Sequence, residues 1–325
     1  MNSRQRFLET MRLGKPDHPP CFEEGMRDEV IDLWRQQGHL ATAGLPSQFH
    51  YDQREEISTD LEIGLDLVKL SRKRSGLKEL RRHLNPDNRH RMPENWAECV
   101  KTSKDRQHVL MLQVHHGFFL TMGVEGWASF EPAMYLLADQ PEFVHGVLDI
   151  TGELAARLAE KVLKEVEVDA FIFGEPISST HGPLISPRMY REFMLRSYQP
   201  LLAVAAQYGV STLIWRSYAN SRKLLPEAVK MGFNCLWASE CDPQAMNYLD
   251  IRGEYGPQLR LIAGIDPNVL RQDEDAIRRE IEDKVPPLLA QGGYIPLAGG
   301  RVREDMPYEN YCFYRSMLET LVGCA

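Results

Sequence analysis

Eight short apolar segments alternate with helical patterns along this chain of 325 residues, and each segment ends in polar or turn-forming residues. Short apolar runs bounded by such residues are typical of buried strands, and apolar residues repeated every three or four positions indicate helices lying on a sheet. The predicted strands centre on about residues 20, 65, 111, 171, 212, 236, 262 and 295. Eight strand–helix units in one chain predict an α/β fold of the (β/α)8 type, a TIM barrel that forms a single domain over residues 1–325.

The alternative architecture is an open doubly wound sheet, but no G-x-G-x-x-G or P-loop sequence is present to support a nucleotide crevice. A predicted helix at 3–13 precedes the first strand, so we expect an N-terminal helical extension. Residues 72–106 form a predicted excursion between strands 2 and 3, and it is rich in basic residues. Eight of them lie within 72–91, namely Arg72, Lys73, Arg74, Lys78, Arg81, Arg82, Arg89 and Arg91. A solvated surface segment and a docking site for an acidic partner are both consistent with this run.

The overall charge limits the class of partner. The chain holds 38 Lys and Arg against 46 Asp and Glu, a net charge of −8, which argues against a general nucleic-acid or anionic-membrane surface. Its six cysteines include no C-x-x-C pair, and the first residues lack the apolar core of a signal peptide. No apolar run approaches the roughly 20 residues of a membrane helix. We therefore expect a cytoplasmic protein whose partner is a small molecule or another protein.

One strand–helix–strand unit in the middle of the chain carries the predicted catalytic residues. A strand at 170–173 leads to Glu175, and a strand at 210–215 leads to Arg216 and Tyr218. Parallel α/β folds build their active sites at the carboxyl ends of the strands, so these three side chains are candidates for catalysis. The alternative is an ion pair between Glu175 and Arg216 that only holds the two strands in register.

Polar residues at the other strand ends complete the predicted pocket. The predicted substrate-binding residues are Glu23, Glu24, Arg27, His116, Glu240 and Arg301. Neighbouring residues of a strand point to opposite faces, so at most one of His115 and His116 is expected to face the site.

Several motifs resemble the uroporphyrinogen decarboxylase superfamily. They are R-F-L at 6–8 with P-D-H-P-P at 16–20, I-S-P at 185–187, L-I-A-G-I-D at 261–266, and G-G-Y-I-P at 292–296 with P-Y-E-N-Y at 307–311. The resemblance covers nearly the whole chain and implies the TIM-barrel fold. It also implies either porphyrinogen decarboxylation or methyl transfer to or from a corrinoid protein, often with zinc.

The first strand end disfavours porphyrinogen decarboxylation. In true decarboxylases this strand leads into a motif resembling R-Q-A-G-R-Y, whose arginines hold propionate carboxylates. The corresponding residues here are Glu23-Glu24-Gly25-Met26-Arg27-Asp28, so Arg27 alone remains, with two acids beside it. Those acids would repel a substrate that carries eight carboxylates.

The zinc ligands of the methyltransferases are also replaced. Those enzymes resemble H-x-C-G-N after strand 5 and G-C after strand 8, or in another branch H-S-D-G-N and D-H. This chain has Arg216, Tyr218 and Gly300 at the ligand positions, and none supplies a usual zinc donor. We therefore expect no metal there and no tightly bound cofactor. A rebuilt metal site is the alternative, with candidate ligands His115, His116, Glu175, His181, Glu240 and Cys241.

Three functions follow as hypotheses. The first is methyl transfer from a small methylated substrate to a corrinoid on a separate protein that closes over the barrel mouth. Tyr218 or Glu175 would protonate the leaving heteroatom, and Arg216 or Arg301 would hold an anionic substrate group. The second is metal-independent decarboxylation of a smaller acid gripped by the same arginines. The third is a non-catalytic binding barrel. The sequence names neither the substrate nor the oligomeric state, and a homodimer stays open.

Overall fold

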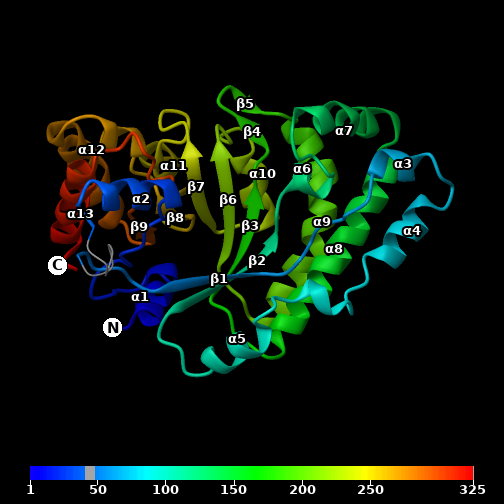
Figure 1. The fold of residues 1–325 in the computed structure, drawn as a ribbon, viewed down its shortest axis with the longest axis horizontal. Coiled ribbons are helices and arrows are strands. Elements are labelled where there is room, and N and C mark those ends of the chain that lie inside the picture. The colour runs from blue at the N-terminus through cyan, green and yellow to red at the C-terminus, as the bar shows by residue number, and fades with distance from the viewer. Residues whose placement is uncertain (41–47, 325) are drawn as a thin grey trace.

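A computed structural model describes residues 1–40 and 48–324, and its centre is one curled sheet of seven parallel strands (Figure 1). The strands follow the order β1-β2-β3-β6-β7-β8-β9 across the sheet. Their bounds are β1 Arg54–Ser58, β2 Val109–His115, β3 Ala170–Glu175, β6 Leu213–Ala219, β7 Cys235–Cys241, β8 Arg260–Ala263 and β9 Tyr294–Ile295. A small antiparallel pair, β4 Ser178–Ser179 and β5 Gly182–Pro183, follows β3.

Helices surround the sheet, with α8 and α9 side by side along one flank and α12 and α13 at the other (Figure 1). Their bounds are α1 Ser3–Met11, α2 Asp28–Gln36, α3 Leu67–Ser71, α4 Gly76–His83, α5 Trp96–Thr102, α6 Phe118–Thr121, α7 Trp127–Asp139, α8 Pro141–Leu163, α9 Pro187–Tyr208, α10 Leu225–Met231, α11 Tyr248–Tyr255, α12 Glu274–Leu289 and α13 Tyr308–Val322. Two short 3-10 helices are η2 Arg89–Arg91 and η3 Pro267–Arg271. None of the described helices is both long and apolar enough to cross a membrane.

Local sequence explains where the long helix α9 begins and ends. The Ser186 hydroxyl accepts a hydrogen bond from the Met189 N–H at 3.2 Å, and Pro187 takes the first helical position, where its missing N–H costs nothing. Gly209 ends the helix in the left-handed conformation, with φ of 74°. The helix of the predicted strand–helix–strand unit is therefore confirmed.

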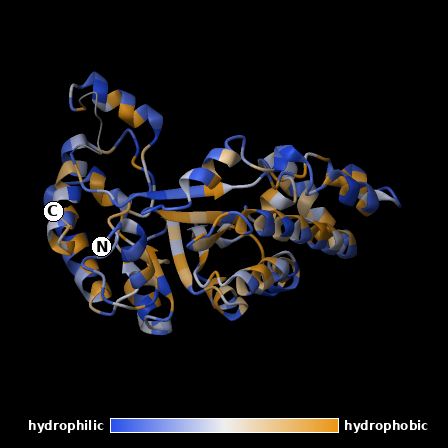
Figure 2. Cartoon of the chain, turned by 90° about the horizontal axis from the view of Figure 1, so that it is seen from below, coloured by the Kyte–Doolittle hydropathy of each residue, from blue (hydrophilic) through white to orange (hydrophobic). Residues whose placement is uncertain are grey.

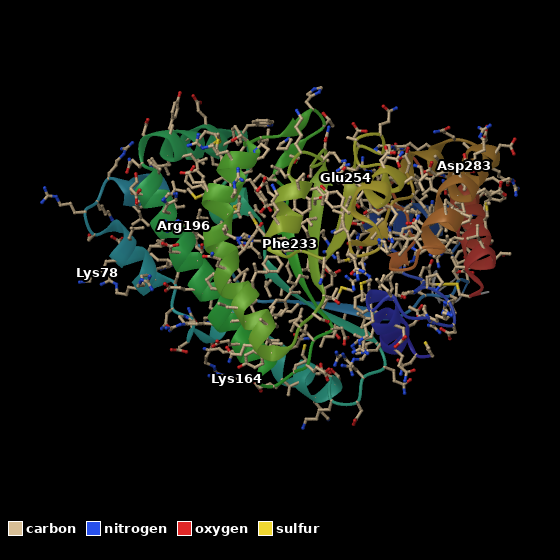
Figure 3. All side chains as sticks on the ribbon, turned by 180° about the vertical axis from the view of Figure 1, so that it is seen from behind. Lys78, Lys164, Arg196, Phe233, Glu254 and Asp283 are labelled. Carbon is tan, nitrogen blue, oxygen red and sulfur yellow. A yellow bond between two sulfur atoms is a disulfide. The ribbon has the colours of Figure 1, made fainter. Side chains whose placement is uncertain are left out.

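Alternation along the strands separates two apolar layers. The inner layer includes Ile172 of β3, Ile214 of β6 and Trp237 of β7, whereas their neighbours Phe173 and Trp215 pack outward against the helices. Figure 2 shows the hydrophobic residues concentrated on the strands and on the helix faces turned toward them. Figure 3 shows labelled charged side chains such as Lys78, Arg196 and Asp283 at the periphery.

Helix α1 closes the amino end of the curled sheet. Its Phe7 and Met11 belong to the inner apolar layer. The Arg4 N–H donates to the Gln107 carbonyl just before β2 at 2.8 Å, and Arg260 at the start of β8 donates from Nε to the Met11 carbonyl at 2.8 Å. The inner space of the curled sheet is therefore filled at this end, and room for a ligand inside it remains at the carboxyl ends of the strands.

The predicted second strand is wrong. Residues 63–70 include helix α3, for which the Asp66 side chain is the N-cap and accepts from the Lys69 N–H at 3.0 Å. The strand is β1, inside the stretch 38–60 that was predicted to be irregular and of which 41–47 lies outside the described residues. β1 reads R-E-E-I-S with Ile57 alone buried, so it lacks the apolar run by which buried strands are recognised.

The predicted first strand at 20–24 is also not a regular strand. The Cys21 carbonyl accepts from the Asp52 N–H at 3.0 Å, and the Gly25 carbonyl accepts from the Val302 N–H at 3.1 Å. Met26 forms an isolated parallel bridge with Val302. Among the described residues the sheet thus has seven strands, and this segment runs along the opening between its two edges with few backbone bonds.

The basic excursion folds back onto the protein surface. Arg81 of α4 pairs with Glu153 of α8, and Lys73 pairs with Glu79 at 3.1 Å. The buried Arg91 donates to the carbonyls of Asp60 and Glu62. Several of the basic residues therefore serve intramolecular contacts.

Candidate active site

A cavity of about 600 Å³ opens at the carboxyl ends of the strands, and we call it the mouth cavity. Its lining is dominated by acids and arginines. The lining residues are Glu24, Met26, Arg27, Asp28, Glu29, Arg54, Glu56, Arg216, Tyr218, Trp237, Ser239, Glu240 and Arg301. Carboxylate and guanidinium groups that lie this close together pair with one another. The charged or polar atoms that have no such partner indicate where a ligand can bind.

Six of the nine side chains predicted for the pocket line the mouth cavity. They are Glu24, Arg27, Arg216, Tyr218, Glu240 and Arg301. The other three, Glu23, His116 and Glu175, lie elsewhere. Alternation explains the division, because residues an even number of positions from an inward-facing strand residue face the cavity and their neighbours face the helices.

Glu175 lies outside the mouth cavity, beneath helix α9. The fully buried carboxyl accepts a hydrogen bond from the Phe118 N–H at 2.9 Å and another from the Tyr198 hydroxyl. Among the described residues it has no ion pair, so the predicted pair with Arg216 is wrong. Burial raises the pKa of Glu175 to about 7, although both hydrogen bonds oppose the shift. A proton donor placed here cannot reach a substrate in the mouth cavity directly.

The two histidines after β2 point to different places. His115 is buried against Phe173 and Tyr198, and burial lowers its pKa to about 3. His116 lines a second cavity of about 550 Å³ together with Gln113. At most one of them was expected to face the site, and neither lines the mouth cavity.

Glu23 turns toward helix α13. One of its carboxylate oxygens lies 3.7 Å from the Arg315 guanidinium and accepts from the Tyr311 hydroxyl at 3.4 Å. Its neighbour Glu24 points the other way, into the mouth cavity. Two adjacent acids thus have different surroundings, which the sequence pattern alone did not distinguish.

Arg216 is held by a residue that the sequence analysis missed. Its Nη1 and Nη2 donate to the two carboxylate oxygens of Glu56 at 2.9 and 2.6 Å, and its guanidinium carbon lies 4.0 Å from the centre of the Trp237 ring. Burial alone would raise the pKa of Glu56, but the hydrogen bonds and charge of Arg216 outweigh it and hold that pKa below its usual range. The expected partner, Glu175, is therefore replaced by Glu56.

Glu24 is a largely buried acid of the mouth cavity whose carboxylate accepts a single hydrogen bond. Its Oε1 accepts a hydrogen bond from the Ser239 hydroxyl, whereas its buried Oε2 has no partner among the described residues. Burial raises the pKa of Glu24 despite the opposing hydrogen bond from Ser239 and the charges of Arg216 and Arg54. A carboxyl in this environment keeps its proton to a higher pH than an exposed glutamate does, and it can donate that proton.

The other cavity residues give a neutral hydroxyl and an aromatic wall. Burial raises the pKa of Tyr218, against the effect of Arg216, so this phenol stays protonated at neutral pH. Arg54 and Arg216 both lie over the ring of Trp237, at 5.0 and 4.0 Å. Arg301 has no hydrogen bond or ion pair within residues 1–40 and 48–324, whereas Glu240 pairs with Arg303 at 3.2 Å.

The mouth cavity offers no cluster of metal ligands. Within the described ranges, the single group of three potential ligands that converge is His18, Cys21 and Cys324, at the opposite end of the sheet. The six candidate ligands for a rebuilt site at the mouth do not come together. A Cβ added at Gly300 would lie 3.3 Å from Cγ of Glu240, so the third family ligand position is also confined.

The raised pKa of Glu175 predicts a pH-dependent stability. In the unfolded chain this acid loses its proton near 4.5, whereas the folded chain keeps the proton up to about 7. The contribution of Glu175 to stability is then greatest below pH 4.5 and falls by about 3 kcal/mol as the pH rises through 7, because a tenfold difference in acid strength between the folded and unfolded chains corresponds to about 1.4 kcal/mol. We expect Glu175→Gln to remove this part of the pH dependence in denaturant titrations at pH 5 and 8. The exposed Glu142→Gln is the control; equal slopes in both variants would contradict the assignment.

Comparison with known proteins places this geometry in a family. The sequence model described as uroporphyrinogen decarboxylase (URO-D) matches residues 119–319. Among solved structures, a methyltransferase from Methanosarcina mazei aligns with a TM-score of 0.62 and 14% sequence identity, over 99% of this chain and 99% of that one. At this identity the likeness shows a shared fold. No curated protein matches the sequence. The matched range contains Arg216 and Tyr218 but neither Glu24 nor Glu56.

Proposed function

The chain belongs to the uroporphyrinogen decarboxylase family, and from this we propose that it is an enzyme that transfers a methyl group from a small methylated compound to a corrinoid carried by a separate protein. The fold shared with the Methanosarcina mazei methyltransferase supports the reaction class. A mouth cavity of about 600 Å³ suits a small molecule. In this proposal the segment 21–26 takes the place of an eighth strand and completes a (β/α)8 barrel.

The observation that carries the proposal is the buried, unpaired oxygen of Glu24. When a methyl group leaves a heteroatom, the bonding electron pair stays on that atom, which then needs a proton. Glu24 supplies the proton in place of Glu175, and the carboxylate left behind is stabilised by the Ser239 hydroxyl and by the charges of Arg54 and Arg216. The neutral hydroxyl of Tyr218 lines the same cavity and can orient the leaving atom.

Zinc at the family position does not fit this chain. Arg216 uses both terminal nitrogens on Glu56, Tyr218 stays protonated, and Gly300 has no side chain. These groups provide no thiolate or imidazole, which zinc sites of this kind require. Acid catalysis and fixed charges therefore replace the metal in the proposal.

Arg301 is the arginine best suited to hold an anionic group of the substrate. It lines the mouth cavity, and no described side chain neutralises it. Arg216 is less suited, because Glu56 already occupies the two nitrogens that would grip a carboxylate. A methylated compound that carries a carboxylate fits both the proton donor and the cation.

An exposed apolar surface is available for the corrinoid protein. Trp127 is 80% exposed, Tyr135 60% and Leu120 44%. They lie on α6 and α7, which follow the carboxyl end of β2 and therefore lie at the mouth end of the molecule (Figure 1). Large exposed aromatic residues are typical of protein–protein interfaces. The corrinoid, when bound on its own protein, supplies the acceptor for the methyl group.

The proposal is tested with free cob(I)alamin as the methyl acceptor. The purified chain is mixed with cob(I)alamin and separately with methoxybenzoates, N-methylated amino acids and S-methylated thioacids, and the demethylated product is measured by mass spectrometry. Transfer from at least one donor is expected, and an uncharged methoxybenzyl alcohol should react more slowly because Arg301 has no group to hold. Release of carbon dioxide from an acid without methyl transfer would contradict the proposal and favour a decarboxylase.

A further inference from the structure

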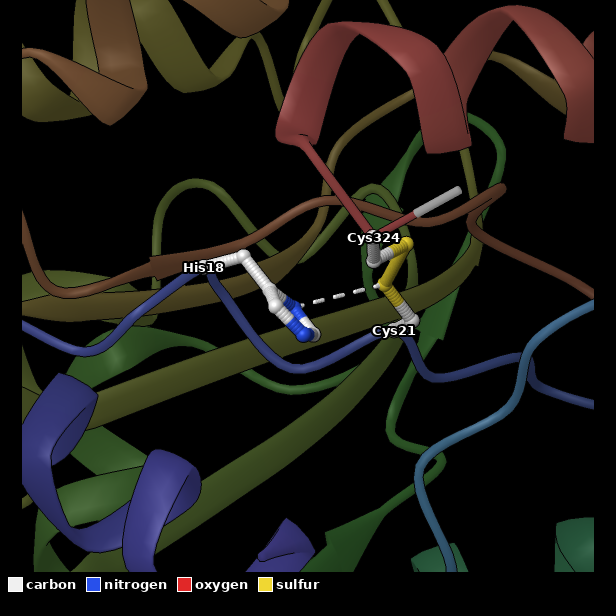
Figure 4. Close-up of side chains that lie close together, drawn as sticks. All are labelled: His18, Cys21 and Cys324. Atoms are coloured by element: carbon white, nitrogen blue, oxygen red, sulfur yellow. Dashed lines mark hydrogen bonds between the residues drawn. A yellow bond between two sulfur atoms is a disulfide. The ribbon is translucent and has the colours of Figure 1, made fainter. Parts of the chain in front are cut away.

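A second cluster of reactive side chains lies at the amino end of the sheet, opposite the mouth cavity. Figure 4 shows His18, Cys21 and Cys324 pointing toward one another. Their potential ligand atoms all lie within 4.8 Å of one another, with Cys21 buried and the other two half-buried. His18 and Cys21 belong to the segment after α1, and Cys324 follows the last turn of α13.

The spacing of the two cysteine backbones favours a bridging ion over a covalent bond. The structure joins Cys21 and Cys324 as a disulfide, yet their Cα atoms are 7.3 Å apart. Disulfides usually span about 4.4–6.8 Å between Cα atoms, and a larger gap requires the backbone to move. Two thiolates that share a tetrahedral zinc at about 2.3 Å keep their sulfurs about 3.8 Å apart, so they accommodate a wider backbone.

His18 provides the nitrogen that such a site requires. Its Nδ1 lies 3.8 Å from the Cys21 sulfur and 2.9 Å from the Pro19 carbonyl. The contact with Pro19 uses a proton on Nδ1, and a metal at this nitrogen would take the place of that proton. Two sulfurs and one imidazole are the donors typical of zinc.

His50 lies beside the cluster, although its ring nitrogens are not among the converging ligand atoms. Its ring centre lies 5.8 Å from that of His18, and the two rings are nearly perpendicular. The backbone of His50 is fixed to α13, because its N–H donates to Glu319 at 3.0 Å and its carbonyl accepts from Arg315 at 2.8 Å. Cys324 follows the same helix, so His50 and Cys324 are both positioned by α13.

Buried charges fix the backbone around the other ligands. The Cys21 N–H donates to the Asp52 carboxylate at 2.8 Å, and Arg6 donates to both Asp52 and Asp17. This network positions the segment 17–21 without using any of the candidate ligands. The ligands are therefore organised by surrounding hydrogen bonds, as in protein metal sites.

We propose that His18, Cys21 and Cys324 bind a zinc ion. Binding removes the protons of both thiols and leaves the sulfurs as thiolates. The ion ties the end of α13 to the segment that carries Glu24 three residues after Cys21, where the sheet has few backbone bonds. The site is separate from the mouth cavity, and the proposal does not depend on the reaction catalysed there.

Metal content of the full chain, purified under reducing conditions and dialysed, tests the site. We expect one zinc per chain in the parent and a loss of at least tenfold in Cys324→Ser and in His18→Ala. Cys241→Ser is the matched control, because Cys241 is a half-buried cysteine at the mouth end. Replacing zinc by cobalt should give a thiolate-to-cobalt absorption band that disappears in the same two variants. Cys324 lies beyond the last turn of α13, and its N–H donates to the Glu319 carbonyl, a backbone bond that serine retains, so its replacement should leave the fold intact.

Two results would overturn the proposal. The first is a reduced chain that takes up neither zinc nor cobalt although its thiols are titratable. The second is a purified chain whose mass is lower by two hydrogens because Cys21 and Cys324 are linked, and which binds no metal once that bond is reduced. Such a chain would have a disulfide and no metal site. Zinc that survives in Cys324→Ser but is lost in Cys241→Ser would instead show a metal site at the mouth.

Discussion

Replacing Glu24 by Gln is expected to lower the rate of methyl transfer by about 10²- to 10⁴-fold, the range typical of a lost general acid. Gln keeps the size of the side chain and accepts the hydrogen bond from Ser239, so the fold should persist. The rate of the parent should fall as the pH rises through the raised pKa of Glu24, because the carboxyl must be protonated to act. The variant should lose this dependence. Rates measured against pH with a single donor decide both points.

Glu55→Gln is the matched control for that experiment. Glu55 lies on β1 and pairs with His108 at 3.2 Å, and it does not line the mouth cavity. Its replacement should leave the rate within a factor of two. If Glu24→Gln kept both the parent rate and the pH profile, the proton would have to come from Tyr218 or from solvent, and Tyr218→Phe would then show the larger loss.

The sequence located strand ends better than it located side-chain directions. Helices α9 and α13 and the strands from β2 onward follow from apolar periodicity and breakers, because each has a clear local signal. The face of the sheet to which a side chain points depends on the exact strand register. An error of one residue in that register moves every side chain of the strand to the opposite face. β3 runs through Glu175, so this acid continues the outward positions Phe171 and Phe173 and ends beneath the helices.

Residues missed by sequence reasoning lacked a local signal. Glu56 lies on β1, whose short and charged sequence does not resemble a buried strand. The cluster of Cys21 and Cys324 has no spacing motif, because 303 residues separate the two cysteines. Such contacts depend on the closure of the whole fold, and one sequence does not specify which distant residues meet.

The pair of Arg216 and Glu56 should contribute to stability as well as to the shape of the mouth cavity. Their side chains are 12% and 26% exposed, between a surface pair and a buried one. We expect Arg216→Met to lower the free energy of unfolding by about 1–3 kcal/mol, because surface pairs contribute about 0–1 kcal/mol and breaking a buried pair costs about 3–5 kcal/mol. Chemical denaturation measures this difference. A Met side chain preserves much of the contact with Trp237. The loss of unfolding free energy therefore reflects mainly the loss of the positive charge of Arg216.

A double-mutant cycle separates this structural role from an anion-holding role. In Arg216→Met, Glu56 keeps its second partner Arg54, so the further change Glu56→Gln should cost less stability than it does in the parent chain, since one of its two ion pairs is already lost. Binding of a methoxybenzoate should then change less in Arg216→Met than in Arg301→Met. Unchanged stability with abolished binding in Arg216→Met would show that Arg216 releases Glu56 to grip the substrate, and the anion-binding role would return to Arg216.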